Sequence, residues 1–125
     1  MARPGGSRSG TQVEARSNRL WPGLLGVLVA IQLLVLYIPT APGGVEVSGL
    51  DKVVHAGVFG LPALLAAARR WWWVVVALVV HAPVSEVLQA TLLPHRDGSV
   101  WDAVADLVGV ALGLLVSSVW RRLAR

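Results

Sequence analysis

Four long apolar stretches constrain the fold of this chain more than any other feature of its sequence. Each is bounded by charged residues, Gly, Pro or Trp, and together they comprise Leu20–Ile38, Leu50–Ala68, Trp71–Leu93 and Trp101–Val119. A helix rises about 1.5 Å per residue, so roughly 20 residues cross a hydrocarbon core of roughly 30 Å. The sequence therefore predicts an all-α integral membrane bundle of about four transmembrane helices.

The composition excludes a soluble domain of the same size. Of the 125 residues, 55% are hydrophobic and only 14% are charged, whereas a soluble domain needs far more polar surface. A helical bundle in water would also show polar faces at helical spacing, and Gly23–Leu36 and Trp71–Val80 have almost none. The chain has no cysteine, which excludes disulfides and thiol chemistry.

The basic residues predict the orientation in the membrane. All but two of the eleven Lys and Arg residues fall into three clusters: Arg3, Arg8, Arg16 and Arg19; Arg69 and Arg70; and Arg121, Arg122 and Arg125. Four spans would place all three clusters on one side, and positive charge is retained in the cytoplasm. We therefore expect both termini inside. The same scatter argues against nucleic acid as a partner, because no basic patch with interleaved aromatics forms.

Tryptophan positions agree with this orientation, because indole rings favour the headgroup level. Every Trp lies at the end of an apolar stretch: Trp21, Trp71, Trp72, Trp73 and Trp120 at the expected inner interface, and Trp101 at the outer one. Residues 1–19, rich in Gly, Ser and Arg, are predicted to be a disordered basic cytoplasmic tail, and residues 20–125 the transmembrane domain. A cleaved signal peptide is the alternative for the first stretch, but its apolar run is longer than a typical signal core.

Polar residues within the apolar stretches converge on one depth, near the expected outer face. This polar layer consists of Asp51, Lys52 and His55 in the second stretch, Glu86 and Gln89 in the third, Arg96 in the following loop, and Asp102 and Asp106 around the start of the fourth. Spacings of three and four residues place each set on one helix face. The face of Asp106 continues through Gly109 and Gly113, where small residues would let a neighbouring helix approach closely.

Ionisable groups within a membrane indicate function by default, because each costs at least a few kcal/mol unless it is paired or hydrated. The structural alternative is that Lys52 and Arg96 neutralise the acids and hold the helices together. Convergence of all these groups on one layer favours a functional pocket.

The order and spacing of the polar layer resemble the VanZ-like family, small bacterial membrane proteins named after a teicoplanin-resistance accessory protein. The matching motifs are Asp51-Lys52-x-x-His55, Glu86-x-x-Gln89, Arg96 shortly after Pro94, and Asp102-x-x-x-Asp106-x-x-Gly109. The family usually has Asn where this chain has Asp106. The resemblance implies a helical cell-envelope protein of the bacterial cytoplasmic membrane, with a link to antibiotic resistance in the namesake. It implies no particular reaction or cofactor.

The leading hypothesis is a protein that binds an anionic or lipid-linked ligand at the outer leaflet, such as a cell-wall precursor or a membrane lipid. Arg96 and Lys52 would hold the anion, while Glu86, Gln89 and Asp102 would orient the ligand. The alternatives are an intramembrane enzyme using His55 with Asp51, and the Glu86 carboxyl, as acid/base groups, a small transporter, and a structural or assembly partner. The sequence contains no H-E-x-x-H motif and no legible nucleophile–base pair, so no metal or cofactor is predicted. Nothing in it indicates an oligomeric state.

The predicted orientation can be tested by labelling introduced cysteines, because the chain has none of its own. Cysteines replacing Ser48 and Ser99, one at a time, should react with a membrane-impermeant thiol reagent in intact cells, whereas a cysteine replacing Ser7 should react only after lysis. The reverse pattern would show that the termini lie outside.

Overall fold

The computed structural model describes residues 8–39, 49–94 and 98–125, and their side chains from residue 19 onward. The described residues form four α-helices and no strand: α1 (Arg8–Tyr37), α2 (Leu50–Ala68), α3 (Trp72–Leu92) and α4 (Val100–Leu123). Each contains a segment long and apolar enough to cross a membrane. The predicted all-α class is confirmed, with four helices long and apolar enough to span a membrane, while the predicted orientation stays a prediction.

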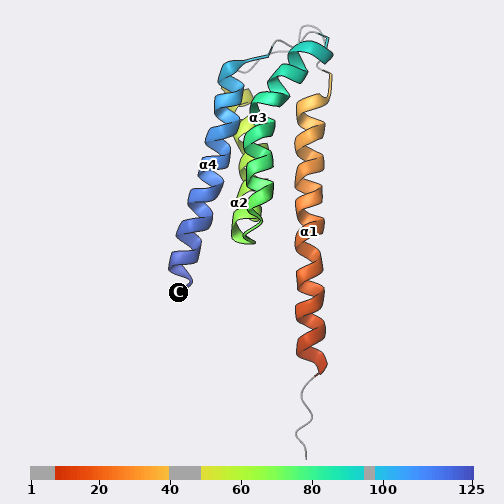
Figure 1. Cartoon of the computed structure of the whole chain (residues 1–125), viewed down its shortest axis with the longest axis vertical. Coiled ribbons are helices and arrows are strands. Elements are labelled where there is room, and N and C mark those ends of the chain that lie inside the picture. The colour runs from red at the N-terminus through yellow and green to blue at the C-terminus, as the bar shows by residue number, and fades with distance from the viewer. Residues whose placement is uncertain (1–7, 40–48, 95–97) are drawn as a thin grey trace, which may run out of the picture.

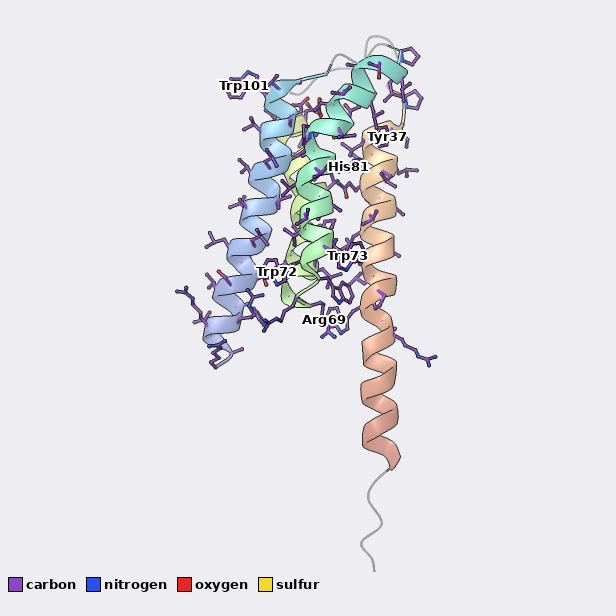
Figure 2. The ribbon with its side chains drawn as sticks, viewed as in Figure 1. Tyr37, Arg69, Trp72, Trp73, His81 and Trp101 are labelled. Carbon is purple, nitrogen blue, oxygen red and sulfur yellow. The ribbon has the colours of Figure 1, made fainter. Side chains whose placement is uncertain are left out.

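The helices run up and down, so that their ends gather at two levels. The C-terminal end of α1, the start of α2, the end of α3 and the start of α4 lie at one level (Figure 1). The α2–α3 connection and the C-terminus lie at the opposite level, and α1 extends beyond it. Trp101 marks the first level, whereas Arg69, Trp72 and Trp73 mark the second (Figure 2).

The closest helix pair is α2 with α4, whose backbones touch at three glycines. A Cβ atom added to Gly109 would collide with the carbonyl oxygen of Ala56 on α2. One added to Gly113 would collide with the carbonyl oxygen of Gly60 and lie 2.8 Å from the backbone nitrogen of Leu64. Such an approach is possible only where side chains are absent, and in lipid it supplies the van der Waals contact that drives helix association.

Two helices extend beyond the apolar stretches that predicted them. α1 begins at Arg8, within the tail of residues 1–19 that the sequence assigns as disordered, and the assignment of that tail stays a prediction. Residues 1–7 lie outside the described residues. A helix nucleated in the apolar segment adds each further residue with one new hydrogen bond, and Gln12, Glu14 and Ala15 are good helix formers. α4 likewise continues past Val119 to Leu123, because hydropathy ends there but helical hydrogen bonding does not.

Basic side chains join three helices at the level of the α2–α3 connection. The Arg121 guanidinium donates 2.7 Å hydrogen bonds from Nη1 to the carbonyl oxygen of Ala67, near the end of α2, and to Oγ of Ser117. The Arg69 guanidinium lies over the ring of Trp21, 5.4 Å from its centroid, which is a cation–π geometry. These contacts satisfy a carbonyl at the end of α2 and tie α1 and α4 to it.

The glycine contacts predict how the bundle responds to a single added methyl group. Gly109→Ala and Gly113→Ala should each lower the free energy of unfolding by about 1–3 kcal/mol, because the Cβ would push against backbone that cannot move aside. Gly26→Ala is the control, since a Cβ there meets nothing within 4 Å. Thermal unfolding in detergent measures all three variants. Equal stability of the three would mean that α2 and α4 do not touch at these positions.

Candidate functional site

Three helices bring the polar layer together at the level marked by Trp101. Asp51, Lys52 and His55 come from the first two turns of α2, Glu86 and Gln89 from the last turns of α3, and Asp102 and Asp106 from the start of α4. Oxygen-bearing side chains are gathered there between the helices (Figure 2). Arg96, the remaining predicted member of the layer, lies outside the described residues.

His55 is the centre of the inner part of the layer, and its side chain is only 3% exposed. Its Nδ1 lies 2.9 Å from Oδ1 of Asp106 and 3.9 Å from Oε1 of Glu86. Its Nε2 lies 3.8 Å from Oδ1 of Asp51, one helical turn away. The nearest partner of His55 is therefore Asp106 on α4, and not Asp51, with which the sequence pairs it. We call His55, Glu86 and Asp106 the buried triad.

Several polar atoms in this inner part have no hydrogen-bond partner among the described residues. They are Oε1 of Glu86, Oδ2 of Asp106 and Nε2 of Gln89. All three side chains are at least nine-tenths buried, with relative exposures of 7%, 0% and 3%. Buried polar groups in folded proteins are nearly always hydrogen-bonded, and an unsatisfied one costs about 1–3 kcal/mol or more when it is charged. These three atoms therefore lack a partner that the described residues could have provided.

The outer rim of the layer is an ion pair between α2 and α4. Lys52 Nζ donates a hydrogen bond of 3.2 Å to Oδ1 of Asp102. The Lys52 side chain is 50% exposed and that of Asp102 13%, so the pair lies at the edge of the bundle. Solvent and headgroups screen such a pair, which therefore contributes modestly to stability.

Ser99 is a member of this site that sequence reasoning missed. Its backbone N–H donates a 2.8 Å hydrogen bond to Oε2 of Glu86, and its Oγ accepts one of 3.3 Å from the backbone N–H of Asp102. Ser99 thereby caps α4 and fixes the Glu86 carboxylate. The signal was present, because a Ser directly before an apolar helix with an acid three residues later is typical of an N-cap.

Gly98 makes the contact between Ser99 and α3 possible. A Cβ added at Gly98 would lie 2.7 Å from the backbone carbonyl oxygen of Glu86, closer than side chains approach backbone. The absence of a side chain lets the chain pass directly against the last turns of α3. The N–H of the next residue, Ser99, then reaches the Glu86 carboxylate.

A second polar cluster lies deeper, between α1 and α3, and is separate from the first. His81 Nε2 lies 3.1 Å from the hydroxyl of Tyr37, and its Nδ1 lies 3.4 Å from Nε2 of Gln32. The ring of Phe59 packs against His81 at 5.6 Å between centroids. Tyr37 and His81 are labelled at neighbouring depths in Figure 2. Both ring nitrogens of His81 thus have partners, which makes this cluster a link between helices.

The charges of the described site and the partners of its serine hydroxyls limit the chemistry that it can perform. The described part of the layer has four carboxyl groups, on Asp51, Glu86, Asp102 and Asp106, against one lysine and one histidine. It is rich in acceptors and suits hydroxyl donors and cations. No described serine hydroxyl contacts a histidine or a carboxylate; that of Ser85, for example, donates to the carbonyl oxygen of Ala82. The described residues thus offer no activated serine nucleophile.

No family model, no curated protein and no solved structure matches this chain. The resemblance to the VanZ-like family therefore stays a prediction.

The capping role of Ser99 can be measured directly. Ser99→Ala should lower the free energy of unfolding by about 1 kcal/mol, because the N–H of Asp102 loses its acceptor. Ser118→Ala is the matched control, since the Ser118 hydroxyl only donates to the carbonyl oxygen of Leu115 within the same helix. If thermal unfolding in detergent shows equal losses for the two variants, Ser99 has no special role at the start of α4.

Proposed function

We propose that this chain is a cell-envelope protein of the bacterial cytoplasmic membrane, of the VanZ-like kind, that binds the head of a lipid or lipid-linked ligand in the outer leaflet. The observation that supports this most directly is the set of buried, unpartnered polar atoms on Glu86, Gln89 and Asp106. They lie between α2, α3 and α4 and have no hydrogen-bond partner among the described residues. A ligand head with hydroxyl or charged groups would do so.

The two parts of the polar layer suit different parts of such a ligand. The inner carboxylates and the Gln89 amide can hydrogen-bond to hydroxyl and amide groups, such as those of a sugar head. The side chain of Lys52 at the rim is half exposed, and its length lets the ammonium group reach a phosphate at the headgroup level. Arg96 belongs to the same hypothesis as a fork for phosphate or carboxylate. A lipid-linked cell-wall precursor combines these features in one molecule.

The proposed orientation places the layer on the outer side, with both termini in the cytoplasm. Arg69 and Arg121 lie at the end of the bundle opposite Trp101 and the polar layer. Positive charge retained in the cytoplasm assigns their end to the inner face. The layer then opens toward the leaflet in which exported lipid-linked ligands accumulate.

An intramembrane enzyme is the second candidate, because the ring of His55 has carboxylates on both sides. A histidine held by an acid on one nitrogen can exchange a proton through the other. The nearest contact, 2.9 Å between His55 Nδ1 and Asp106 Oδ1, would fix the ring. Hydrolysis or transfer would then need a nucleophile supplied by water or by the substrate. Turnover of a lipid substrate by the purified protein would favour this candidate over simple binding.

Binding of polyprenyl-diphosphate lipids to the purified protein in nanodiscs tests the proposed function. Glu86→Gln and Lys52→Ala should each weaken binding about tenfold or more, as expected when a charge-assisted hydrogen bond of about 1.5–3 kcal/mol is lost. The melting temperature of Lys52→Ala should stay near that of the parent, because the Lys52–Asp102 pair is at the exposed rim. Arg122→Ala, at the other end of α4, is the control and should bind normally. Normal binding by both layer variants would contradict a ligand site.

Charge exchange across the Lys52–Asp102 contact separates a ligand site from a structural ion pair. The double variant Lys52→Asp with Asp102→Lys restores the attraction across the 3.2 Å contact with the signs reversed. A pair that only holds helices together should recover stability and function in it. A site for an anionic head should recover stability but not binding, since the charge of the ligand is unchanged.

A further inference from the structure

We infer that the buried triad of His55, Glu86 and Asp106 is a binding site for a divalent transition-metal ion, with Zn²⁺ as the ion that it fits best. The inference stands apart from the proposed function, because metal binding can be measured without any lipid ligand. The sequence predicts no metal, since the three ligands come from three helices and share no motif.

The ligand atoms are of the right kind and nearly in place. Zn²⁺ takes imidazole nitrogen and carboxylate oxygen at about 2.0–2.2 Å, so tetrahedral ligand atoms lie roughly 3.3–3.5 Å from one another. His55 Nδ1 lies 2.9 Å from Asp106 Oδ1 and 3.9 Å from Glu86 Oε1, which bracket that separation. One ligand atom from each of the three side chains lies within 4.8 Å of the others. The two distances from His55 each differ from that separation by about half an ångström, and the two carboxylate oxygens lie within 4.8 Å of each other.

The unpartnered atoms are the second, independent observation. Oε1 of Glu86 is the oxygen that faces His55, and it has no hydrogen-bond partner among the described residues. Oδ2 of Asp106 is likewise unpartnered, and Asp106 is fully buried. A hydrogen bond between His55 and Asp106 alone leaves both oxygens unsatisfied. A cation bound by the two carboxylates satisfies Oε1 of Glu86 and offsets their repulsion, and it satisfies Oδ2 of Asp106 when that carboxylate binds through both oxygens.

The surroundings of the triad would orient each ligand toward a metal. In the tautomer with its proton on Nε2, His55 presents the lone pair of Nδ1 to both carboxylates, and the Nε2 proton faces Asp51 at 3.8 Å. Metal-ligating histidines commonly direct their other nitrogen at a carboxylate in this way. The second oxygen of Glu86 is held by the N–H of Ser99 at 2.8 Å, which leaves Oε1 to the triad.

A neighbouring group that also includes His55 is the weaker site. Asp51, His55 and Asp102 lie within the same 4.8 Å of one another. Asp102, however, is already paired with Lys52, and the side chain of Asp51 is 54% exposed. The buried triad has two carboxylate oxygens with no hydrogen-bond partner among the described residues, and it is therefore the site that we assign.

Metal content and metal-dependent stability test this inference on the full chain. The protein should be purified in detergent through an affinity tag that contains no histidine, and its metals measured by inductively coupled plasma mass spectrometry. We expect about one Zn²⁺ per chain and a melting temperature that falls on removal of the metal with a chelator and returns with added Zn²⁺. Mn²⁺ found in its place, and lost with the same ligands, would support the site and correct the ion.

Variants of the triad show where the metal binds and distinguish metal binding from a hydrogen bond between His55 and Asp106. Asp106→Asn keeps the shape and an acceptor for His55 but loses the charge, so it should reduce bound metal at least tenfold and abolish the rise in melting temperature with Zn²⁺. His55→Ala should do the same. His81→Ala removes a histidine of the separate cluster and Asp102→Ala a carboxylate of the rim, and both should keep the metal.

Two results would overturn the inference. One is a parent protein that holds no metal and whose melting temperature does not respond to Zn²⁺ or Mn²⁺; a proton shared between Glu86 and Asp106 would then be the occupant. The other is bound metal that persists in both Asp106→Asn and His55→Ala, which would place it elsewhere in the chain. Because the first result concerns the parent alone, poor folding of a variant cannot hide it.

Discussion

The close approach of α2 and α4 is the constraint on which the rest of the structure depends. Gly60, Gly109 and Gly113 allow backbone to meet backbone, and no larger residue fits at the contact points of the last two. The polar residues lie directly beyond this seam, so His55 and Asp106 face each other across it at 2.9 Å. If the helices were spaced as ordinary side chains require, this contact would open and the inner part of the polar layer would come apart.

The third helix of the site is held by a different device. Gly98 and Ser99 pass against the last turns of α3, and the N–H of Ser99 anchors the Glu86 carboxylate. The same serine caps α4, so the residue that starts the helix also positions an acid from its neighbour. Glu86 therefore arrives at the triad with one oxygen fixed and the other directed at His55. An acid held in this way is prepared for a ligand without having to reorganise.

Burial of unpartnered carboxylates costs free energy unless a ligand or an ion binds to them. Glu86 and Asp106 are buried between helices, and the described part of the polar layer has four carboxyl groups against one lysine and one histidine. A metal ion in the triad would be bound by Glu86 and Asp106, so a lipid head would then contact the Gln89 amide and the Lys52–Asp102 rim. An ion bound in the triad would supply positive charge beside the rim, where an anionic head would approach. The separate His81 cluster needs no ligand or ion, since both ring nitrogens of His81 have hydrogen-bond partners.

The sequence by itself determined the number of long apolar helices and the level of the bundle at which the described polar residues gather, because hydropathy, helix length and helical period depend only on residue order. It did not show that α1 begins at Arg8, since the Gly- and Ser-rich composition before residue 20 conceals residues that an existing helix can extend through. It also paired His55 with Asp51, the neighbour that helical spacing provides. Only the tertiary structure decided that Asp106 is closer, that Lys52 pairs with Asp102, and that Ser99 holds Glu86. Those choices depend on how closely and in what register separate helices pack, and a linear pattern does not contain the distance between two backbones.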